Sequence, residues 1–251
     1  MLEPFPKPEE RAIHNELQRS YYENALNKPA MQIADSPYVL RHVERVANAI
    51  KLRPGQRILE VGSGLGKFSI PLIERGLDLT CLDISPIMMN LLQDRVTGRG
   101  LAVKTVACDI ADAGANLPVI FDRVIGFFTL HHMHNLEVAF RGVRSVLLPG
   151  AKVAFCEPLA RNPLYYLQIA TTPGMHWRAE KGIVNMRSSV VFSAMKAAGL
   201  TTIARYSYGF FPPFIVNQKW GARLEDVLNR YNSLQMGHAF QIFCAVNPDR
   251  T

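Results

Sequence analysis

The sequence has few cysteines and no long apolar run. The four cysteines, Cys81, Cys108, Cys156 and Cys244, lie far apart, and none forms a CxxC pair or has a histidine at metal-site spacing. We therefore expect small buried side chains in a reducing compartment. No apolar stretch approaches the roughly 20 residues that a membrane-spanning helix needs. Residues 1–11 are too acidic and too rich in proline for a signal peptide, so a cytoplasmic location is the expectation.

Clustered positive charge is also missing, although the chain is basic overall. Its 251 residues include 28 lysines and arginines against 21 acidic residues, a net charge of +7. The basic residues are dispersed, with no run of five or more and no alternation with aromatic residues of the kind that follows a phosphate backbone. Nucleic acid is therefore not the expected partner. The same charge would steer an anionic small molecule towards the protein.

The most informative stretch is residues 57–72, RILEVGSGLGKFSIPL. Its apolar run at 58–61 predicts a strand buried on both faces, which ends at the segment GSGLG, residues 62–66. Three glycines at alternate positions remove Cβ atoms from the turn, so its backbone can approach a ligand closely. A helix is expected to begin near Gly66, with its free N–H groups directed at the loop. The stretch therefore predicts a nucleotide-binding turn.

The spacing of the glycines separates two classes of cofactor. A dinucleotide fingerprint needs a further glycine where Lys67 stands, so the pattern is GxGxG and not GxGxxG. The acidic Glu60 at the strand end suits a cationic sulfonium and ammonium and would repel a pyrophosphate. Glu60, Gly62, Gly64 and Gly66 resemble motif I of the class I S-adenosylmethionine-dependent methyltransferases, (Asp/Glu)-x-Gly-x-Gly-x-Gly. A nicotinamide cofactor is the least expected.

Two further acids follow the next predicted strands. Residues 77–82 predict a strand closing on Asp83, about twenty residues past the glycines, where an open α/β sheet places a carboxylate on ribose hydroxyls. Residues 101–107 predict a third strand, soon followed by Asp109. The resemblance implies that these are the motif II and motif III acids, with Asp109 accepting a hydrogen bond from the adenine amino group. Alone, Asp83 would equally suit a helix N-cap.

The rest of the chain continues the alternation of strands and helices. Two helices are predicted before the first strand, at 8–26 and, with Ser36 as N-cap, at 36–50. A fourth buried strand is predicted at 121–128, and a helix at 136–147 leads into a fifth. The resemblance implies a doubly wound, Rossmann-like α/β fold. Its seven-stranded sheet would have the order 3-2-1-4-5-7-6, the last strand antiparallel and helices on both faces.

We predict a single domain over residues 1–251, because no repeat, low-complexity segment or linker divides the chain. Its predicted parts are N-terminal helices with a lid at 1–52, a cofactor-binding core at 53–157, a cap insertion at 158–186, and the remainder of the sheet at 187–251 with an insertion at 210–234. Substrate specificity is expected to lie in the two insertions.

The resemblance implies S-adenosyl-L-methionine as the cofactor and S-adenosyl-L-homocysteine as the product. The residues it implies for cofactor binding lie at the ends of the first four strands: Glu60, Gly62, Ser63, Gly64, Gly66, Asp83, Ile84, Asp109, Ile110 and Phe127. No metal site is expected.

Two histidines follow the fourth predicted strand, at the sheet edge where ligands bind. A methyl sulfonium is already a strong electrophile, so the protein has chiefly to exclude water and hold the acceptor in line. A hydroxyl acceptor would gain from a base, for which His132 is the first candidate; an orienting or packing role is the alternative. His131 is the second, expected to face the methionine part of the cofactor or to cap the next helix. His134, Glu157 and His176 are held in reserve.

Aromatic residues gather outside the predicted sheet, and some of them are expected to be core. The candidates for substrate binding are Tyr21, Tyr22, Tyr165, Trp177 and Phe211. After the fourth strand there is no Asn/Asp-Pro-Pro-Tyr/Phe, no Pro-Cys and no glutamate pair, which the family's base-amino, cytosine-C5 and arginine methyltransferases would have. A small, apolar or aromatic metabolite methylated on O, N or C is therefore expected. An RNA-directed methyltransferase and a non-catalytic adenosylmethionine-binding module are the alternatives.

Overall fold

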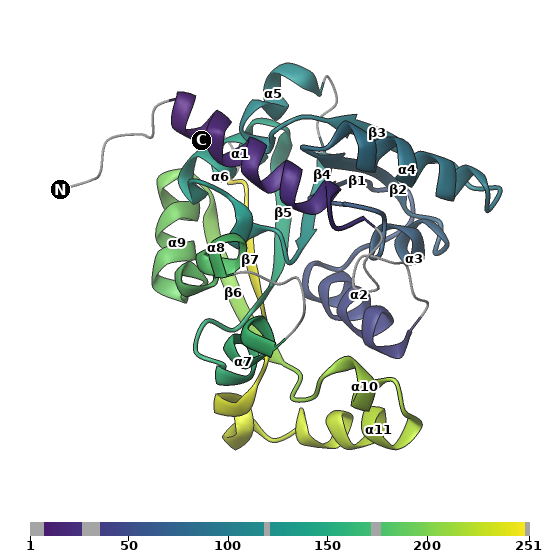
Figure 1. The fold of residues 1–251 in the computed structure, drawn as a ribbon, viewed down its shortest axis with the longest axis vertical. Helices are drawn as coiled ribbons and strands as arrows, with labels where there is room; N and C mark the ends of the chain where they lie inside the picture. The colour runs from purple at the N-terminus through teal and green to yellow at the C-terminus, as the bar shows by residue number, and fades with distance from the viewer. Residues whose placement is uncertain (1–7, 27–35, 118–120, 172–176, 249–251) are drawn as a thin grey trace.

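The computed structural model describes residues 8–26, 36–117, 121–171 and 177–248. Seven strands form one sheet of order β3-β2-β1-β4-β5-β7-β6, in which β1 to β5 are parallel and β7 is antiparallel to both of its neighbours (Figure 1). The strands are β1 (Arg57–Val61), β2 (Asp78–Asp83), β3 (Lys104–Ala107), β4 (Phe121–Phe127), β5 (Leu147–Pro158), β6 (Thr201–Tyr208) and β7 (Phe240–Val246). The predicted fold and strand order are confirmed.

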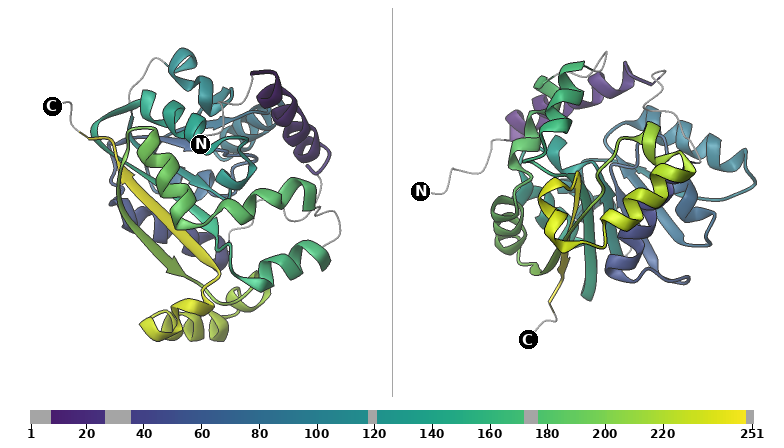
Figure 2. Two further views of the ribbon diagram at one scale, coloured as in Figure 1. Left: turned by 90° about the vertical axis from the view of Figure 1, so that its left-hand side faces the viewer. Right: turned by 90° about the horizontal axis from the view of Figure 1, so that it is seen from below.

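Helices cover both faces of the sheet (Figure 2), and an apolar layer lies on each face. Successive side chains of a strand point to opposite faces, so Ile58 joins one layer and Leu59 the other. The first layer is built by α2 (Pro37–Ile50), α3 (Ser69–Ile73) and α4 (Pro86–Thr97), and the second by α5 (Ala113–Asn116), α6 (Leu136–Ser145) and α9 (Ser188–Ala197). Burial on both faces is why the strands read as continuous apolar runs.

Serine caps fix the beginnings of two of these helices. The Ser36 hydroxyl accepts from the N–H of Val39 at the start of α2, as predicted, and the Ser85 hydroxyl accepts from the N–H of Met88 at the start of α4. Each serine is followed by a proline at the first helical position, where its missing N–H costs nothing. The cap on α4 sets the direction of the chain directly after β2.

The remaining helices lie outside the two layers. Helix α1 (Pro8–Glu23) crosses the molecule beside α6 and β4 (Figure 1). The others are α7 (Pro163–Thr171), α8 (Trp177–Glu180), α10 (Pro213–Val216) and α11 (Lys219–Leu228), with short 3-10 turns η2 (Ile110–Asp112), η3 (Leu130–His132), η4 (Lys181–Asn185) and η5 (Asn232–Gly237). Within the described ranges, no helix has the length and apolar character that crossing a bilayer requires.

Candidate active site

The glycine-rich turn after β1 has a backbone conformation that glycine adopts most readily. Gly62, Gly64 and Gly66 have φ angles of 71°, 51° and 86°. A Cβ at Gly62 would lie 2.1 Å from Oγ1 of Thr129, and one at Gly66 would lie 2.1 Å from Leu92. At Gly64 the nearest atom outside its chain neighbours is 4.0 Å away. The turn is therefore packed on either side of Gly64 and open at Gly64, where a ligand can approach the backbone.

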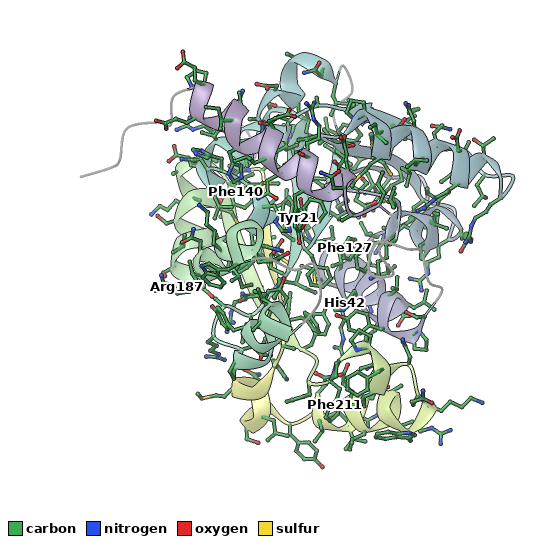
Figure 3. The ribbon with its side chains drawn as sticks, viewed as in Figure 1. Tyr21, His42, Phe127, Phe140, Arg187 and Phe211 are labelled. Atoms are coloured by element: carbon green, nitrogen blue, oxygen red, sulfur yellow. The ribbon has the colours of Figure 1, made fainter. Side chains whose placement is uncertain are left out.

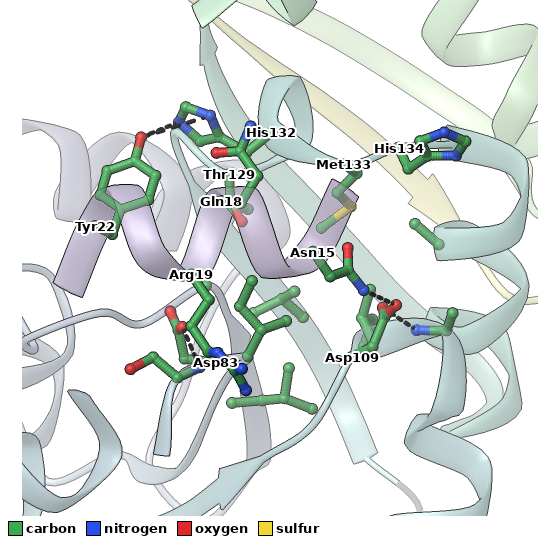
Figure 4. Close-up of a pocket in the computed structure, with 18 of the residues that line it drawn as sticks. Asn15, Gln18, Arg19, Tyr22, Asp83, Asp109, Thr129, His132, Met133 and His134 are labelled. Carbon is green, nitrogen blue, oxygen red and sulfur yellow. Dashed lines mark hydrogen bonds between the residues drawn. The ribbon is translucent and has the colours of Figure 1, made fainter. Parts of the chain in front are cut away.

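A cavity of about 200 Å³ lies where β1, β2 and β4 end, beneath α1 (Figure 4). This is the edge of an open α/β sheet at which ligands bind. Its walls come from α1, the glycine turn and the segments after β2, β3 and β4, and they include Asn15, Gln18, Arg19, Tyr22, Gly62, Gly64, Asp83, Ile84, Asp109, Ile110, Phe128, Thr129, His132, Met133 and His134.

Two of the three predicted acids line this cavity. Asp83 ends β2 and accepts hydrogen bonds from the backbone N–H of Gly64 at 3.0 Å and of Ser85 at 3.1 Å. Burial raises the pKa of Asp83, and the backbone donors oppose that rise. Asp109 accepts from the N–H of Ala111 at 2.9 Å through one carboxylate oxygen. Its other oxygen accepts from the side chain of Asn15 in α1, at 2.6 Å.

Glu60, the third acid, does not line the cavity, so the structure does not bring it together with Asp83 and Asp109. Its side chain is 2% exposed and lies on the face of β1 that it shares with Ile58, where Sγ of Cys81 is 3.9 Å from the carboxyl group. Burial raises the pKa of Glu60 to about 8. At neutral pH the group therefore keeps its proton and offers little negative charge to a cation. Val61, on the opposite face, lines the cavity instead.

Of the other residues predicted to contact the cofactor, some line the cavity and some do not. Ile84 and Ile110 line the cavity, as predicted from their places after β2 and β3. Phe127 does not: its ring stacks on Phe68 in the core, with centroids 4.5 Å apart. The next residue, Phe128, has a φ of 54° that turns the chain out of β4, and it is Phe128 that lines the cavity.

Ser63 lies in the glycine turn but also outside the cavity walls. It is 6% exposed, and its hydroxyl donates to the backbone carbonyl of Glu60 at 3.1 Å. The same serine's backbone N–H donates to the carbonyl of Leu82. Gly66 likewise packs against Leu92 and does not line the cavity. Ser63 and Gly66 therefore support the turn on the side away from the cavity. The structure does not bring either residue to the cavity, where their predicted contacts with a cofactor would be made.

His131 is a buried cation and not a base at the cavity. Its Nδ1 donates to Glu157 at 2.6 Å, and its Nε2 is 3.3 Å from Glu180. Glu157 also accepts from the backbone N–H groups of Thr129 and Leu130, at 2.8 and 2.7 Å. Burial alone would lower the pKa of His131, but Glu157 and then Glu180 raise it to about 9. The imidazolium therefore keeps its proton at neutral pH and holds the segment after β4 against β5.

His132 lines the cavity, and α1 contacts it twice (Figure 4). The Tyr22 hydroxyl is 2.6 Å from its Nε2, and Nε2 of His14 donates to its backbone carbonyl at 2.7 Å. His134, held in reserve on sequence grounds, also lines the cavity. His176 lies outside the described residues. Of the predicted bases, His132 is therefore the one that lines the cavity and has a ring nitrogen within hydrogen-bond distance of a second ionisable side chain.

Helix α1 presents a polar face to the cavity. The residues at spacing i, i+4, i+7 and i+11 that line it are Arg11, Asn15, Gln18 and Tyr22. The opposite face exposes Ile13 and Leu17. At the end of the helix, the Ser85 hydroxyl donates to Glu23 at 2.6 Å, and at its start Arg11 pairs with Asp112 at 3.0 Å. The lid predicted in this region is therefore attached to the body mainly by polar contacts.

The predicted substrate residues are only partly brought together. Tyr22 lines the cavity, and the ring of Tyr21 packs edge-on against the ring of Tyr22. Tyr165 donates instead to Glu180, at 3.0 Å, behind His131. Trp177 is half exposed on the outer side of α7 and α8, where its ring lies 6.0 Å from that of Tyr166.

Phe211, another predicted substrate residue, does not line the cavity. It lies beside α10 and α11, well away from Tyr21 (Figure 3). Its backbone N–H donates to the buried Glu225 of α11, at 3.1 Å. The structure therefore does not bring Phe211 to this cavity.

Comparison with known proteins agrees with this geometry. A family model described as a methyltransferase domain matches residues 58–150. This segment runs from β1 to the turn within β5 and holds the glycine turn and both cavity acids. Together with the strand order of the sheet, this match identifies residues 58–150 as similar to a class I S-adenosylmethionine-dependent methyltransferase domain.

Several named proteins resemble this methyltransferase domain. Methyltransferase GfsG of Streptomyces halstedii is 28% identical over 138 residues, 53% of this chain and 49% of that protein. The ubiquinone biosynthesis O-methyltransferase of Xanthomonas euvesicatoria is 29% identical over 121 residues, 48% of this chain and 50% of that protein. The chain thus spans about half the length of the curated relatives that it matches. Among solved structures, phosphoethanolamine N-methyltransferase 2 of Haemonchus contortus superposes with a TM-score of 0.64 at 16% identity, over 92% of this chain and 60% of that one.

The cavity of the methyltransferase domain fits an adenosyl group. Gly64 leaves its backbone open to close approach, and Asp83 offers carboxylate oxygens beside it. Ile84 and Ile110 provide apolar walls suited to a purine, near the carboxylate of Asp109. Sequence reasoning missed Asn15, whose side chain donates a hydrogen bond to the carboxylate of Asp109. The polar stripe along α1, at helical spacing, was the signal that could have identified it.

Proposed function

We propose that this protein transfers a methyl group from S-adenosyl-L-methionine to an O, N or C atom of a small, apolar or aromatic metabolite. The observation that carries the proposal is the convergence of Asp83 and Asp109, from the ends of adjacent strands, on the cavity that Gly64 leaves open. Residues 58–150, which match a methyltransferase domain, include all three. The O- and N-methyltransferases among the similar proteins support the reaction class.

In this proposal the cofactor is held by the residues of the cavity edge. Asp83 binds the ribose hydroxyls, Asp109 accepts from the adenine amino group, and Ile84 and Ile110 enclose the purine. Bound S-adenosyl-L-methionine supplies an electrophilic methyl group with a neutral leaving group. Helix α1 covers this end of the cavity and would exclude water from it.

His132 is proposed as the base for a hydroxyl acceptor. Its Nε2 lies at the cavity wall, 2.6 Å from the hydroxyl of Tyr22. The acceptor's proton would pass to Nε2 of His132, directly or through the Tyr22 hydroxyl, as the acceptor oxygen attacks the methyl carbon. An amine or carbanion acceptor would need only to be positioned. His131 would not act as the base, because Glu157 and Glu180 keep its imidazole protonated.

Two measurements test the proposal. Isothermal titration with S-adenosyl-L-homocysteine is expected to show saturable one-site binding; its absence would count against the cofactor. Release of S-adenosyl-L-homocysteine from S-adenosyl-L-methionine would then be followed with panels of phenols, quinols, amines and RNA. Turnover with a small aromatic acceptor supports the proposal. Turnover only with RNA would contradict the substrate class, and binding without turnover on any acceptor would favour a non-catalytic module.

A further inference from the structure

The far end of the molecule carries a concentration of exposed apolar side chains. Of the 15 large apolar side chains that are exposed among the described residues, seven lie between residues 214 and 236. Four of them are 57% to 77% exposed: Phe214, Trp220, Tyr231 and Met236. This segment, formed by α10, α11 and η5, lies at the opposite end of the molecule from α1 (Figure 1). Large contiguous apolar patches on a protein surface mark interaction sites.

Helix α11 orders these side chains into a stripe. Trp220, Leu224 and Val227 are spaced i, i+4 and i+7, so they share one face of the helix, and Tyr231 continues the same direction beyond its end. The opposite face is buried at Gly221, where a Cβ would lie only 2.1 Å from a backbone carbonyl oxygen of α10. The apolar stripe is therefore the outer face of a firmly packed helix. We call Phe214, Trp220, Leu224, Val227, Tyr231 and Met236 the carboxy-terminal apolar face.

The charged groups around this face leave an excess of cations. Of the two acids of the segment, Glu225 is 2% exposed and accepts from the backbone of Phe210 and Phe211, whereas Asp226 is 53% exposed and pairs with Arg41 of α2. The cations turn outward, as Lys219, Arg223 and Arg230 are all exposed. None of these three is in an ion pair with a residue that the structure describes. The outer surface of the segment thus presents apolar and positively charged groups together.

We propose that the carboxy-terminal apolar face docks on the surface of an anionic lipid bilayer. A tryptophan-containing apolar stripe flanked by lysine and arginine is the pattern that lies in a membrane interface, with the rings among the acyl boundary and the cations at the headgroups. A second copy of this chain fits less well. Two-fold pairing would oppose the same patch to itself and bring unpaired cations of both copies together. The proposal does not rest on the methyltransferase reaction.

Flotation of the full chain with vesicles tests this docking. We expect binding to phosphatidylcholine vesicles containing about 30% phosphatidylglycerol, little binding to phosphatidylcholine alone, and loss of binding as salt is raised. The double variant Trp220→Ser/Leu224→Ser and the triple variant Lys219→Gln/Arg223→Gln/Arg230→Gln should each bind roughly tenfold more weakly or worse. In a Trp177→Phe background, the emission of Trp220 should shift to shorter wavelength on anionic vesicles.

A matched control separates docking through this face from non-specific binding by exposed apolar side chains. Ile203→Ser/Tyr206→Ser removes two side chains of similar exposure from the edge strand β6 and should leave vesicle binding within twofold. Affinity for S-adenosyl-L-homocysteine should be unchanged in all variants, which shows that they fold. Equal binding to neutral and anionic vesicles, or no binding at low salt, overturns the proposal. So does a wild-type dimer in sedimentation that Trp220→Ser/Leu224→Ser converts to monomer.

Discussion

The phenolic oxygen of Tyr22 lies 2.6 Å from Nε2 of His132, although 110 residues separate them in the chain. Tyr22 belongs to α1, and His132 follows β4 at the sheet edge. Burial, with Glu180 as the next cause, raises the pKa of Tyr22 well above its ordinary value, so its hydroxyl keeps its proton at neutral pH. The position of α1 therefore decides whether His132 has this partner.

Replacing His132 should affect turnover much more than cofactor binding. With a hydroxyl acceptor, we expect His132→Gln to lower kcat by roughly 10²- to 10⁴-fold, because the acceptor loses its base. Tyr22→Phe should have a smaller effect of the same kind. S-adenosyl-L-homocysteine affinity, measured by titration, should stay within about threefold of wild type. His134→Gln, at another point of the cavity wall, is the control; equal losses in both histidine variants would contradict a specific role for His132.

Asp83 should dominate cofactor affinity. Asp83→Asn removes a carboxylate that we expect to accept two ribose hydroxyls, so S-adenosyl-L-homocysteine should bind roughly 10- to 100-fold more weakly by isothermal titration. The matched control is Asp78→Asn, at the exposed opposite end of the same strand, where affinity should not change. Unaltered binding by Asp83→Asn would show that the cofactor lies elsewhere.

Glu60 should make the protein less stable as the pH rises from about 4.5 to about 8. Its pKa rises from 4.5 to about 8 on folding. Between these values the folded state holds a proton that the unfolded state has lost, so the free energy of unfolding falls with rising pH, by a few kcal/mol in all. Glu60→Gln should flatten this dependence in urea unfolding between pH 5 and pH 9. Glu44→Gln, at an exposed site on α2, should leave it intact; an unchanged slope in Glu60→Gln is the contrary result.

Breaking the Glu157–His131 pair should destabilise the fold. Glu157→Gln leaves a buried imidazolium without its nearest carboxylate, at a cost of roughly 3–5 kcal/mol in the free energy of unfolding. Glu137→Gln removes the partly exposed partner of the exposed Arg141 and should cost less than about 1 kcal/mol. The measurement is urea unfolding of both variants at pH 7. Similar small losses in the two would mean that the buried pair is not a structural support.

The contacts of α1 with Asp109 should control how often the helix lifts. Arg11→Ala/Asn15→Ala removes the hydrogen bond from Asn15 to Asp109 and the ion pairs of Arg11 with Asp109 and Asp112, so amide hydrogen exchange within residues 8–23 should accelerate roughly tenfold. Glu16→Ala, on the solvent side of the same helix, is the control for helix propensity. Acceleration spread over the sheet as well would indicate general destabilisation and not lid opening.

Sequence reasoning predicted the fold because its signals are local and repeated. Apolar runs, serine caps and the glycine turn each specify an element, and the resemblance fixed the order of the strands. The side chains at the strand ends were harder to place. Glu60 and Val61 are adjacent, and only the pleat of β1 sends the first into the core and the second to the cavity. Phe127 was predicted at the cavity in place of Phe128 for a similar reason. The left-handed φ of Phe128, which turns the chain at this point, has no sequence signature.

The role of His131 was unpredictable for a different reason. Its protonation depends on Glu157 and Glu180, which are 26 and 49 positions further along the chain and come together only in the folded protein. The inward face of α1, by contrast, was visible in the spacing of its polar residues. A helix whose polar side faces the protein is easily passed over when inward faces are expected to be apolar.

The way α1 is fastened has a consequence for exchange of the bound molecule. Hydrogen bonds and ion pairs to Asp109, Asp112 and Ser85 secure it, and Gln18 is its one fully buried side chain among the described residues of the helix. Water can replace such contacts one by one, whereas an apolar seam would have to open all at once. We therefore expect a bound molecule to leave the cavity when α1 alone detaches, with the seven-stranded sheet unchanged.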